Sequence, residues 1–356
     1  MRARQNLMTA VDLFCGAGGL TRGLLNAGVR VAAGYDIDTA CQYAYERNNA
    51  CASFKLKSIA DLSSEELKAI YPEGHTRILV GCAPCQPFSK YTQGLDKQHD
   101  LKWGLLHEFG RLIRDVKPEI ISMENVPEIR RHSVFQTFIS TLEKAGYHVS
   151  HQEAFCPDFG VPQQRKRLVL LASLLGPISL LKPQKLTTPR TVREAIANLP
   201  TLQAGDEHPE DAMHRACRLS PLNLKRIMVS HPGGSWRDWP SDLVAKCHRE
   251  LSGQTYPSVY GRMEWDQPSP TITTQFFGYG NGRFGHPEQD RAITLREGAI
   301  LQSFPESYEF ISKGRPVSFA ALGRMIGNAV PVRLGEAIGH SIKHHLKHST
   351  RRERHD

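Results

Sequence analysis

The chain has 356 residues, of which 40% are hydrophobic and 23% are charged, as expected for a globular protein with a sizeable core. It contains no apolar run near the ~20 residues that span a membrane, and its first ten residues lack the apolar stretch of a secretion signal. These features exclude a membrane-spanning protein and predict an intracellular one. The net charge of +9 favours a polyanionic partner, whose phosphates the basic side chains would neutralise.

The first half of the chain alternates apolar, β-rich runs with amphipathic stretches. The predicted strands are 9–14, 30–36, 77–82, 119–125 and 167–173, and the predicted helices are 19–28, 39–49, 104–115 and 133–145. Such alternation is typical of a parallel sheet flanked by helices. We therefore expect an α/β fold with a doubly wound, mostly parallel sheet.

The composition of the chain changes after about residue 182. From there on, Pro, Gly, His and Trp become frequent in loop-rich stretches such as HPGGSWRDWP. Helical character returns with TLREGAILQSF, which begins at residue 294. We expect a large domain over 1–182 and 291–345, and a smaller irregular domain over 183–290. Residues 346–356 form a basic tail, for which a frayed terminus and a phosphate-contacting arm both remain open.

The stretch DLFCGAGG (12–19) follows the first predicted strand and opens the first predicted helix. Its glycines would let the backbone approach a ligand at the helix N-terminus, and Asp36 ends the second strand, where it would hold a ribose. Nicotinamide and S-adenosylmethionine binders both use this geometry, whereas a plain strand-to-helix turn explains the glycines equally well. Phe14 and Ile37 would either sandwich an adenine or line the core.

Two cysteines lie close together in GCAPCQPFS (81–89), and the chain's eight cysteines are scattered, which predicts reduced thiols. A redox pair would begin a helix, which Pro87 disfavours, and a zinc site would need a second pair. A nucleophile fits better, because a thiol after a parallel strand lies at the edge where open α/β sheets bind ligands. No metal is predicted. The later residues considered for a separate zinc site are His214, Cys217, His231, Cys247 and His248.

Further polar residues are expected at the same edge of the sheet. MENV (123–126) ends the next predicted strand, so Glu124 would emerge there, and QQRKR (163–167) would bring Arg165 and Arg167 toward it. A thiol, a carboxyl and a guanidinium beside a bound cofactor favour a covalent mechanism on a polar ring.

Together these stretches resemble the motifs of the cytosine-5 DNA methyltransferase family, of the prokaryotic restriction-modification type, in family order and over nearly the whole chain. The motifs are DLFCGAGG, GCAPCQPFS, MENV, VPQQRKRLVLLA, TLREGAILQSFP and IGNAVPVRLGEAIG. The resemblance implies a Rossmann-like, S-adenosylmethionine-dependent methyltransferase fold. It also implies that 1–182 and 291–345 carry catalysis and cofactor binding and that 183–290 is the target recognition domain.

The resemblance identifies Cys85 as the nucleophile and makes Cys82 a bystander. Cys85 would add to carbon 6 of a flipped-out cytosine, so that carbon 5 can take the methyl group. Glu124 would protonate or hydrogen-bond ring nitrogen 3, and Arg165 would contact the base carbonyl. Gln163 and Arg167 are expected as supporting partners, with Arg167 in an ion pair.

The cofactor implied by the family is S-adenosyl-L-methionine, with S-adenosyl-L-homocysteine as its product. Cofactor contacts are expected from Phe14, Gly16, Ala17, Gly18, Gly19, Asp36, Ile37, Ser58, Ile59, Pro84, Leu105, Asn328 and Val330. The family usually has an acid after the third strand, where this chain aligns Ser58 more naturally than Asp61, so adenine readout stays open. DNA contacts are expected from Ser89, Gln93, Arg237, Arg262, Thr271 and Arg283.

Two alternative functions remain open from the sequence. A transfer RNA cytosine-5 methyltransferase shares this active site, although the Cys-Phe-Thr signature of that branch does not occur in the chain. A DNA-binding module without catalysis would keep the basic surface, but Cys85, Glu124 and Arg165 argue against it. The expected partners are double-stranded DNA and, genetically rather than physically, a cognate restriction endonuclease. We expect a cytoplasmic, nucleoid-associated monomer.

Overall fold

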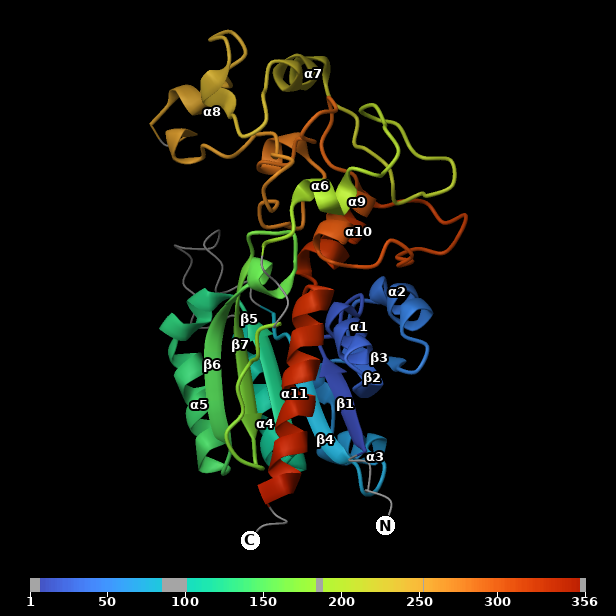
Figure 1. The fold of residues 1–356 in the computed structure, drawn as a ribbon, viewed down its shortest axis with the longest axis vertical. Helices are drawn as coiled ribbons and strands as arrows, with labels where there is room; N and C mark the ends of the chain where they lie inside the picture. Colours follow the sequence, from blue (N-terminus) through green and yellow to red (C-terminus); the bar gives the residue numbers. More distant parts are fainter. Residues whose placement is uncertain (1–6, 85–100, 184–187, 252, 353–356) are drawn as a thin grey trace. The chain divides into compact units, whose positions relative to one another are not determined.

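The computed structural model of the protein describes residues 7–84, 101–183, 188–251 and 253–352 (Figure 1). Its backbone contacts divide the chain into two compact units. Unit 1 comprises Met1–Phe155, Lys166–Lys185 and Val330–Asp356, and unit 2 comprises Cys156–Arg165 and Leu186–Ala329. The sequence-based boundaries differ from these mainly over 291–329, which the sequence analysis grouped with the large domain. These residues cluster with unit 2, because helix α9 (Leu295–Leu301) packs against α6 (Val192–Ile196) and α10 (Phe319–Asn328).

Unit 1 is an α/β unit built on one seven-stranded sheet. Its strands are β1 (Met8–Leu13), β2 (Arg30–Asp36), β3 (Ser53–Leu56), β4 (Thr76–Gly81), β5 (Ile120–Asn125), β6 (His148–Phe155) and β7 (Lys166–Ser173). Its α-helices are α1 (Gly19–Asn26), α2 (Cys41–Asn48), α3 (Ser64–Ile70), α4 (Leu101–Val116), α5 (Ser133–Lys144) and α11 (Val332–Arg352), with 3-10 turns at η1 (Ile59–Asp61) and η4 (Pro127–Arg131).

The strand order is β3-β2-β1-β4-β5-β7-β6, and the predicted doubly wound, mostly parallel sheet is confirmed. The strands β1 to β5 pair in parallel, whereas β7 runs antiparallel to both β5 and β6. Leu13 pairs with Tyr35 on one side and with Gly81 on the other, and Gly81 pairs with Met123. The carboxyl ends of β1, β2, β4 and β5 therefore lie along one edge of the sheet, which is where α/β sheets bind ligands.

The two edge strands and the short helix α3 were not predicted from the sequence. Strand β3 has four residues, SFKL, of which Phe54 is buried and the others are exposed. Strand β6, HVSHQEAF, buries Ala154 fully and is otherwise polar or partly exposed. These two strands bury few side chains, so they lack the continuous apolar run that marks the central strands β1, β4 and β5.

Helix α11 packs along α1, and in Figure 1 it crosses in front of the sheet (red). The approach is close because a Cβ on Gly23 would collide with the backbone of α11 near Val332, and one on Gly339 would collide with Ala27. At the C-terminal end of α1, the carbonyl of Ala27 accepts a hydrogen bond from Lys343 of α11 at 2.7 Å. Much of the segment expected as a basic tail is therefore the last part of this helix, and residues 353–356 lie outside the described ranges.

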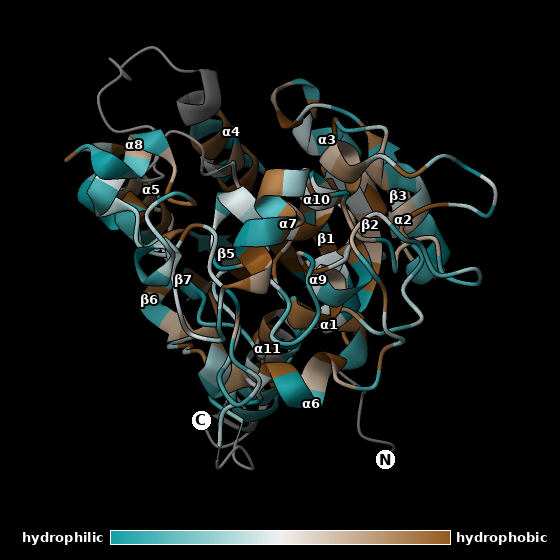
Figure 2. Ribbon diagram, turned by 90° about the horizontal axis from the view of Figure 1, so that it is seen from above, coloured by the Kyte–Doolittle hydropathy of each residue, from teal (hydrophilic) through white to brown (hydrophobic). Residues whose placement is uncertain are grey.

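Unit 2 contains short helices joined by long irregular segments. Besides α6, α9 and α10 it has α7 (Pro221–Met228), α8 (Lys246–Arg249) and the 3-10 turns η5 (Cys156–Phe159), η6 (Trp236–Asp238), η7 (Gly253–Thr255) and η8 (Tyr279–Asn281). In Figure 2, α7 carries hydrophilic and hydrophobic residues side by side. It buries Ile227 in a cluster with Trp236, Trp239 and Tyr279, so aromatic side chains replace regular secondary structure as the source of packing here.

Candidate functional site

The glycine loop after β1 is shaped by left-handed backbone. Gly16 has φ 52° and Gly18 has φ 89°, and Phe14 adopts φ 60°. Gly18 precedes the first residue of α1, and its N–H donates to the carbonyl of Cys15 at 2.9 Å. Glycine is required where such conformations are adopted without steric cost, so this tight turn explains why the motif has its glycines here.

Asp36, at the end of β2, organises the loop. Its Oδ2 accepts the N–H of Gly16 at 2.8 Å, and its Oδ1 accepts the N–H groups of Ile37 at 2.8 Å and Asp38 at 2.9 Å. A carboxylate that accepts several backbone N–H groups is held rigidly. Asp36 is predicted from the sequence to bind a ribose, and in the structure its carboxylate also links the loop after β1 to the end of β2.

The surroundings of this loop fit an adenosine-containing cofactor. Ile37 is 71% exposed, so its side chain offers an apolar surface that a purine could cover. A Cβ placed on Gly16 would meet no atom within 4 Å, so the space above the loop is open. Open space, an exposed apolar side chain and a fixed carboxylate together match what such a ligand needs.

The other predicted cofactor residues differ in their exposure. Ile59 is 2% exposed and packs in the core of unit 1, so its side chain is not open to a ligand. Ser58 is half-buried and caps η1, accepting the N–H of Ala60 at 3.2 Å. Asn328 is exposed at the end of α10 in unit 2. The remaining members lie in unit 1, where Ala17, Gly18, Gly19 and Val330 are buried and Pro84 and Leu105 are half-buried.

A buried polar cluster that was not predicted from the sequence lies beneath the glycine loop. Asp12 is 1% exposed, and its Oδ2 accepts the hydroxyl of Thr21 at 2.7 Å; the Thr21 hydroxyl also lies 3.1 Å from the hydroxyl of Tyr45. Burial raises the pKa of Asp12 to about 7, and the nearby charge of Asp36 acts in the same direction. Burial also raises the pKa of the Cys15 thiol, which therefore stays protonated and unreactive at neutral pH.

The predicted nucleophile Cys85 lies outside the described residues, as do Ser89 and Gln93. The segment that leads to it from β4 is described and is tied to both neighbouring strands. The N–H of Cys82 donates to the carbonyl of Leu13 at 3.3 Å, and Asn125 Nδ2 donates to the carbonyl of Ala83 at 3.1 Å. Asn125, the third residue of MENV and the last residue of β5, was not singled out from the sequence because asparagine at the end of a strand is usually a turn residue.

Glu124, at the carboxyl end of β5, is 2% exposed and has two polar partners. Arg167 Nε lies 2.9 Å from its Oε1, in a close ion pair without the alignment of a hydrogen bond. The thiol of Cys82 donates to its Oε2 at 2.8 Å. A buried carboxylate is costly unless paired, so the two partners explain how Glu124 is kept in place at the edge of the sheet.

In unit 2 the arginine motif forms its own buried frame. Arg165 is 2% exposed and donates to the carbonyls of Ile272 at 2.9 Å and Gly327 at 3.0 Å. Gln163 is fully buried; its Nε2 donates to Gln302 Oε1 at 2.9 Å and its Oε1 accepts the N–H of Ile272 at 2.8 Å. These bonds fix the direction in which the Arg165 guanidinium points within unit 2.

The predicted DNA-contact residues in unit 2 behave differently. Arg262 is 4% exposed, and its guanidinium donates to the carbonyls of Ile227, Ser230, His286 and Gln289 and pairs with Asp290. Burial with every donor engaged removes Arg262 from the candidates for base contact.

The three other candidates within the described part of unit 2 are less buried than Arg262. Arg237 is exposed over the ring of Trp236, and Arg283 is half-buried. Thr271 donates to the carbonyl of Gln164 at 3.1 Å.

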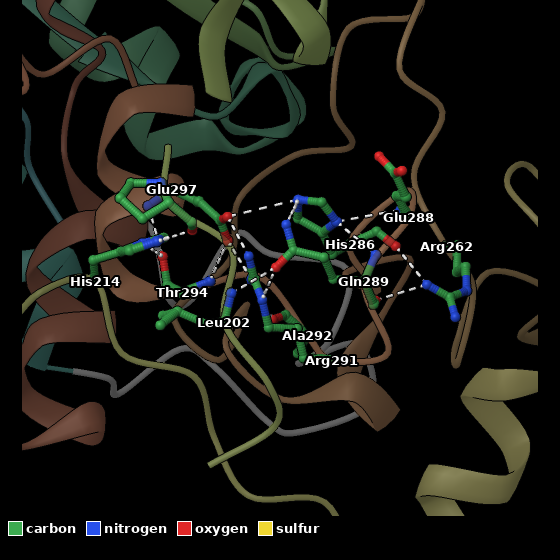
Figure 3. Close-up of polar contacts among 11 residues, drawn as sticks. Leu202, His214, Arg262, His286, Glu288, Gln289, Arg291, Ala292, Thr294 and Glu297 are labelled. Atoms are coloured by element: carbon green, nitrogen blue, oxygen red, sulfur yellow. Dashed lines mark hydrogen bonds and ion pairs between the residues drawn. The ribbon is translucent and has the colours of Figure 1, made fainter. Parts of the chain in front are cut away.

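A charged network forms the interior of unit 2 around Glu297 (Figure 3). Arg291 and Glu297 are both fully buried and form two hydrogen bonds, of 2.8 and 2.7 Å. Although burial acts to raise it, the Arg291 guanidinium holds the pKa of Glu297 at about 2, and burial lowers the pKa of His286 to about 4. Within the described ranges no group of three metal-ligating side chains occurs, and His214 instead bonds to Thr294 and the Pro200 carbonyl.

Comparison with known proteins agrees with this architecture. The sequence model of the family described as C-5 cytosine-specific DNA methylase matches residues 8–344. M.HgiDII, a type II methylase of Herpetosiphon aurantiacus, is 56% identical over 334 residues, which cover 92% of this chain and 93% of that protein. M.PspPI, a type II methyltransferase of Psychrobacter sp. (strain TA137), is 32% identical over 345 residues, covering 92% of this chain and 77% of its own.

Solved structures share the fold at low sequence identity. A protein from an E. coli prophage, described as a proposed DNA modification methyltransferase, superposes with a TM-score of 0.74 at 21% identity, covering 96% of this chain and 99% of that chain. The Dnmt2 methyltransferase of S. pombe gives a TM-score of 0.63 at 18% identity, with 96% and 98% covered. Along the described ranges, no helix combines the length and the apolar character needed to cross a membrane.

The sheet order and the likeness to solved structures define the fold of unit 1 as Rossmann-like α/β. The chain belongs to the C-5 cytosine-specific DNA methylase family, and it is a DNA cytosine-5 methyltransferase that resembles the type II enzymes. The predicted family and enzyme class are thus confirmed.

Proposed function

We propose that this enzyme methylates carbon 5 of a cytosine that is flipped out of a specific duplex DNA sequence, through a covalent adduct with Cys85. The observation that carries the proposal is the buried carboxyl of Glu124, held by Arg167 at the carboxyl end of β5. It lies beside the segment 82–84, which leads directly into Cys85.

The chemistry asked of these residues follows from the cytosine ring. The Cys85 thiolate forms a bond to carbon 6, which pushes electrons onto the ring, and Glu124 supplies a proton to nitrogen 3. Carbon 5 then becomes nucleophilic and takes the methyl group. A base then takes the carbon 5 proton, the sulfur–carbon bond breaks to release the thiolate, and nitrogen 3 returns its proton to Glu124. Arg165 would stabilise the adduct at the base carbonyl.

S-adenosylmethionine would supply the methyl group as an electrophile when bound at the glycine loop. The chain's own residues have the tasks of binding and orientation there. Asp36 fixes the loop through Gly16 and the following turn, Ile37 offers an apolar face, and Phe14 flanks the same loop. The product released would be S-adenosylhomocysteine.

Duplex DNA must be opened to present carbon 6, because the neighbouring stacked bases cover the ring faces from which a thiolate would attack. Flipping the base out costs about a few kcal/mol. We assign target recognition to unit 2, with Arg237, Arg283 and Thr271 as candidate contacts and with Ser89 and Gln93 from the segment after Cys85. The net charge of +9 would favour encounter with DNA.

We further propose that the enzyme is a cytoplasmic monomer, encoded together with a restriction endonuclease but not bound to it.

The test is bisulfite sequencing of mixed-sequence DNA after incubation with the protein and S-adenosylmethionine. We expect protected cytosines in one recurring context, and none with the Cys85→Ser variant. Transfer RNA offered in parallel should remain unmodified. Absence of protection in every DNA context would overturn the DNA proposal, and protection by the Cys85→Ser variant would overturn the covalent mechanism.

A further inference from the structure

Cys82 lies where three described side chains of unit 1 converge. Its thiol donates to Glu124 Oε2 at 2.8 Å, while Arg167 pairs with Oε1 of the same carboxyl at 2.9 Å. Glu124 is 2% exposed, so loss of either partner leaves a buried carboxylate with less compensation for its lost hydration. The family resemblance assigns Cys82 no role in the reaction. Its contact with Glu124 suggests one.

The two partners of Glu124 differ in whether they tolerate a proton on the carboxyl oxygen that they contact. Oε1 faces a permanently charged guanidinium, next to which a proton is electrostatically disfavoured. When Glu124 carries a proton, that proton therefore belongs on Oε2, the oxygen that Cys82 contacts. A thiol can donate to a carboxylate oxygen and, after rotation about its Cβ–Sγ bond, can accept from a carboxylic acid. Cys82 thus suits both protonation states.

From this geometry we infer that Cys82 is a positioning residue for Glu124, which keeps Oε2 in a fixed direction in both its charged and its protonated form. The inference rests on the proposed function, in which Glu124 gives and recovers a proton. Cys82 is also held in place itself, because its N–H donates to Leu13 and the next residue is fixed by Asn125. Positioning by preorganised partners is how a buried acid is kept in a productive direction.

The first experiment compares Cys82→Ala with Cys82→Ser by steady-state methylation of an oligonucleotide that contains the protected site. Loss of a hydrogen bond to a charged group should lower kcat about tenfold in Cys82→Ala, with the KM values for DNA and cofactor within about twofold of wild type. Serine keeps a donor and acceptor, so Cys82→Ser should retain kcat within about threefold. Cys51→Ala is the matched control, because Cys51 is an exposed thiol elsewhere in unit 1.

Three outcomes would overturn the inference: Cys82→Ala with an unchanged kcat, Cys82→Ser as impaired as Cys82→Ala, or an effect confined to KM. The second of these would indicate that the sulfur acts by packing rather than by hydrogen bonding. Each of them leaves the proposed methylation reaction intact, because the wild-type enzyme would still be active.

A second measurement tests the contact between Cys82 and Glu124 by protein stability, without a methylation assay. Urea unfolding of Cys82→Ala, Glu124→Ala and the double variant forms a double-mutant cycle, because alanine removes the thiol or the carboxyl entirely. We expect the effects on the free energy of unfolding to be non-additive, because each variant removes one side of the same hydrogen bond. Additive effects would overturn the inference even if the enzyme is active, and an inactive wild type with non-additive effects would count against the proposed function alone.

Discussion

Arg167 Nε lies 2.9 Å from Glu124 Oε1, and the two side chains come from the neighbouring antiparallel strands β7 and β5. The relation depends on register, since Glu124 pairs with Val169 and Asn125 pairs with Leu168, which brings the start of β7 beside the end of β5. Because β7 runs antiparallel to β5, the first residues of β7 lie beside the carboxyl end of β5. Arg167 is thereby placed next to Glu124 at the edge of the sheet.

Removing Arg167 should destabilise unit 1 because it leaves the Glu124 carboxylate buried without its cation. We expect Arg167→Ala to lower the free energy of unfolding by about 3 kcal/mol in urea titrations. Arg130→Ala is the matched control, because Arg130 pairs with Glu153 at the surface, and it should change stability by less than about 1 kcal/mol. Equal effects of the two variants would contradict the importance of burial. Glu124→Gln should restore part of the stability lost in Arg167→Ala.

Asp36→Asn should weaken cofactor binding because an amide cannot accept all the N–H groups that the carboxylate accepts from Gly16, Ile37 and Asp38. We expect the Kd of S-adenosylmethionine, measured by isothermal titration calorimetry, to rise at least about tenfold. Asp115→Asn, an exposed position near the end of α4, should leave the Kd unchanged. A normal Kd in Asp36→Asn would contradict the assignment of the glycine loop as the cofactor site.

Asp12 predicts a pH dependence of stability. Its pKa is raised by burial from 3.8 to about 7, so the folded state keeps this proton between about pH 4 and 7 whereas the unfolded state has lost it. The stabilisation from the protonated group is therefore present below pH ~4 and is lost as the pH rises toward 7.

Asp12→Asn mimics the protonated acid and should not show this loss. The difference in unfolding free energy between Asp12→Asn and wild type should grow as the pH rises from 4 to 7, by on the order of 3 kcal/mol. Groups such as His286 titrate equally in both proteins and cancel in this difference. Urea titrations at several pH values provide the measurement, and a difference that does not vary with pH would contradict the prediction.

Arg262 and Arg237 form a matched pair for separating structure from DNA contact. Arg262→Ala should lower the free energy of unfolding by about 3 kcal/mol, because several buried carbonyls lose their donor. Arg237→Ala should change stability by less than about 1 kcal/mol but weaken DNA binding and reduce its salt dependence by about one counterion. Chemical unfolding and DNA titrations at several salt concentrations measure both, and the reverse pattern would contradict the assignment.

The fold and the site were open to prediction to different degrees. The central strands β1, β4 and β5 and the glycine loop could be predicted because a buried parallel strand needs a continuous apolar run and a left-handed turn needs glycine. Strands β3 and β6 could not, because their residues are mostly polar and their pairing comes from neighbours far away in sequence. Arg262 was misjudged for a related reason: a charged residue in an irregular segment gives no local signal that it is buried.

The sequence by itself determined the class of this protein, since six ordered motifs specify the family, the sheet and the candidate acid Glu124. Tertiary structure decided which side chains meet. Cys82 contacts Glu124 across 42 residues of sequence, and Asp36 holds Gly16 across 20. Motifs record which residues occur near one another along the chain, whereas hydrogen bonds and ion pairs depend on strand order, register and burial, which exist only once the whole sheet has formed.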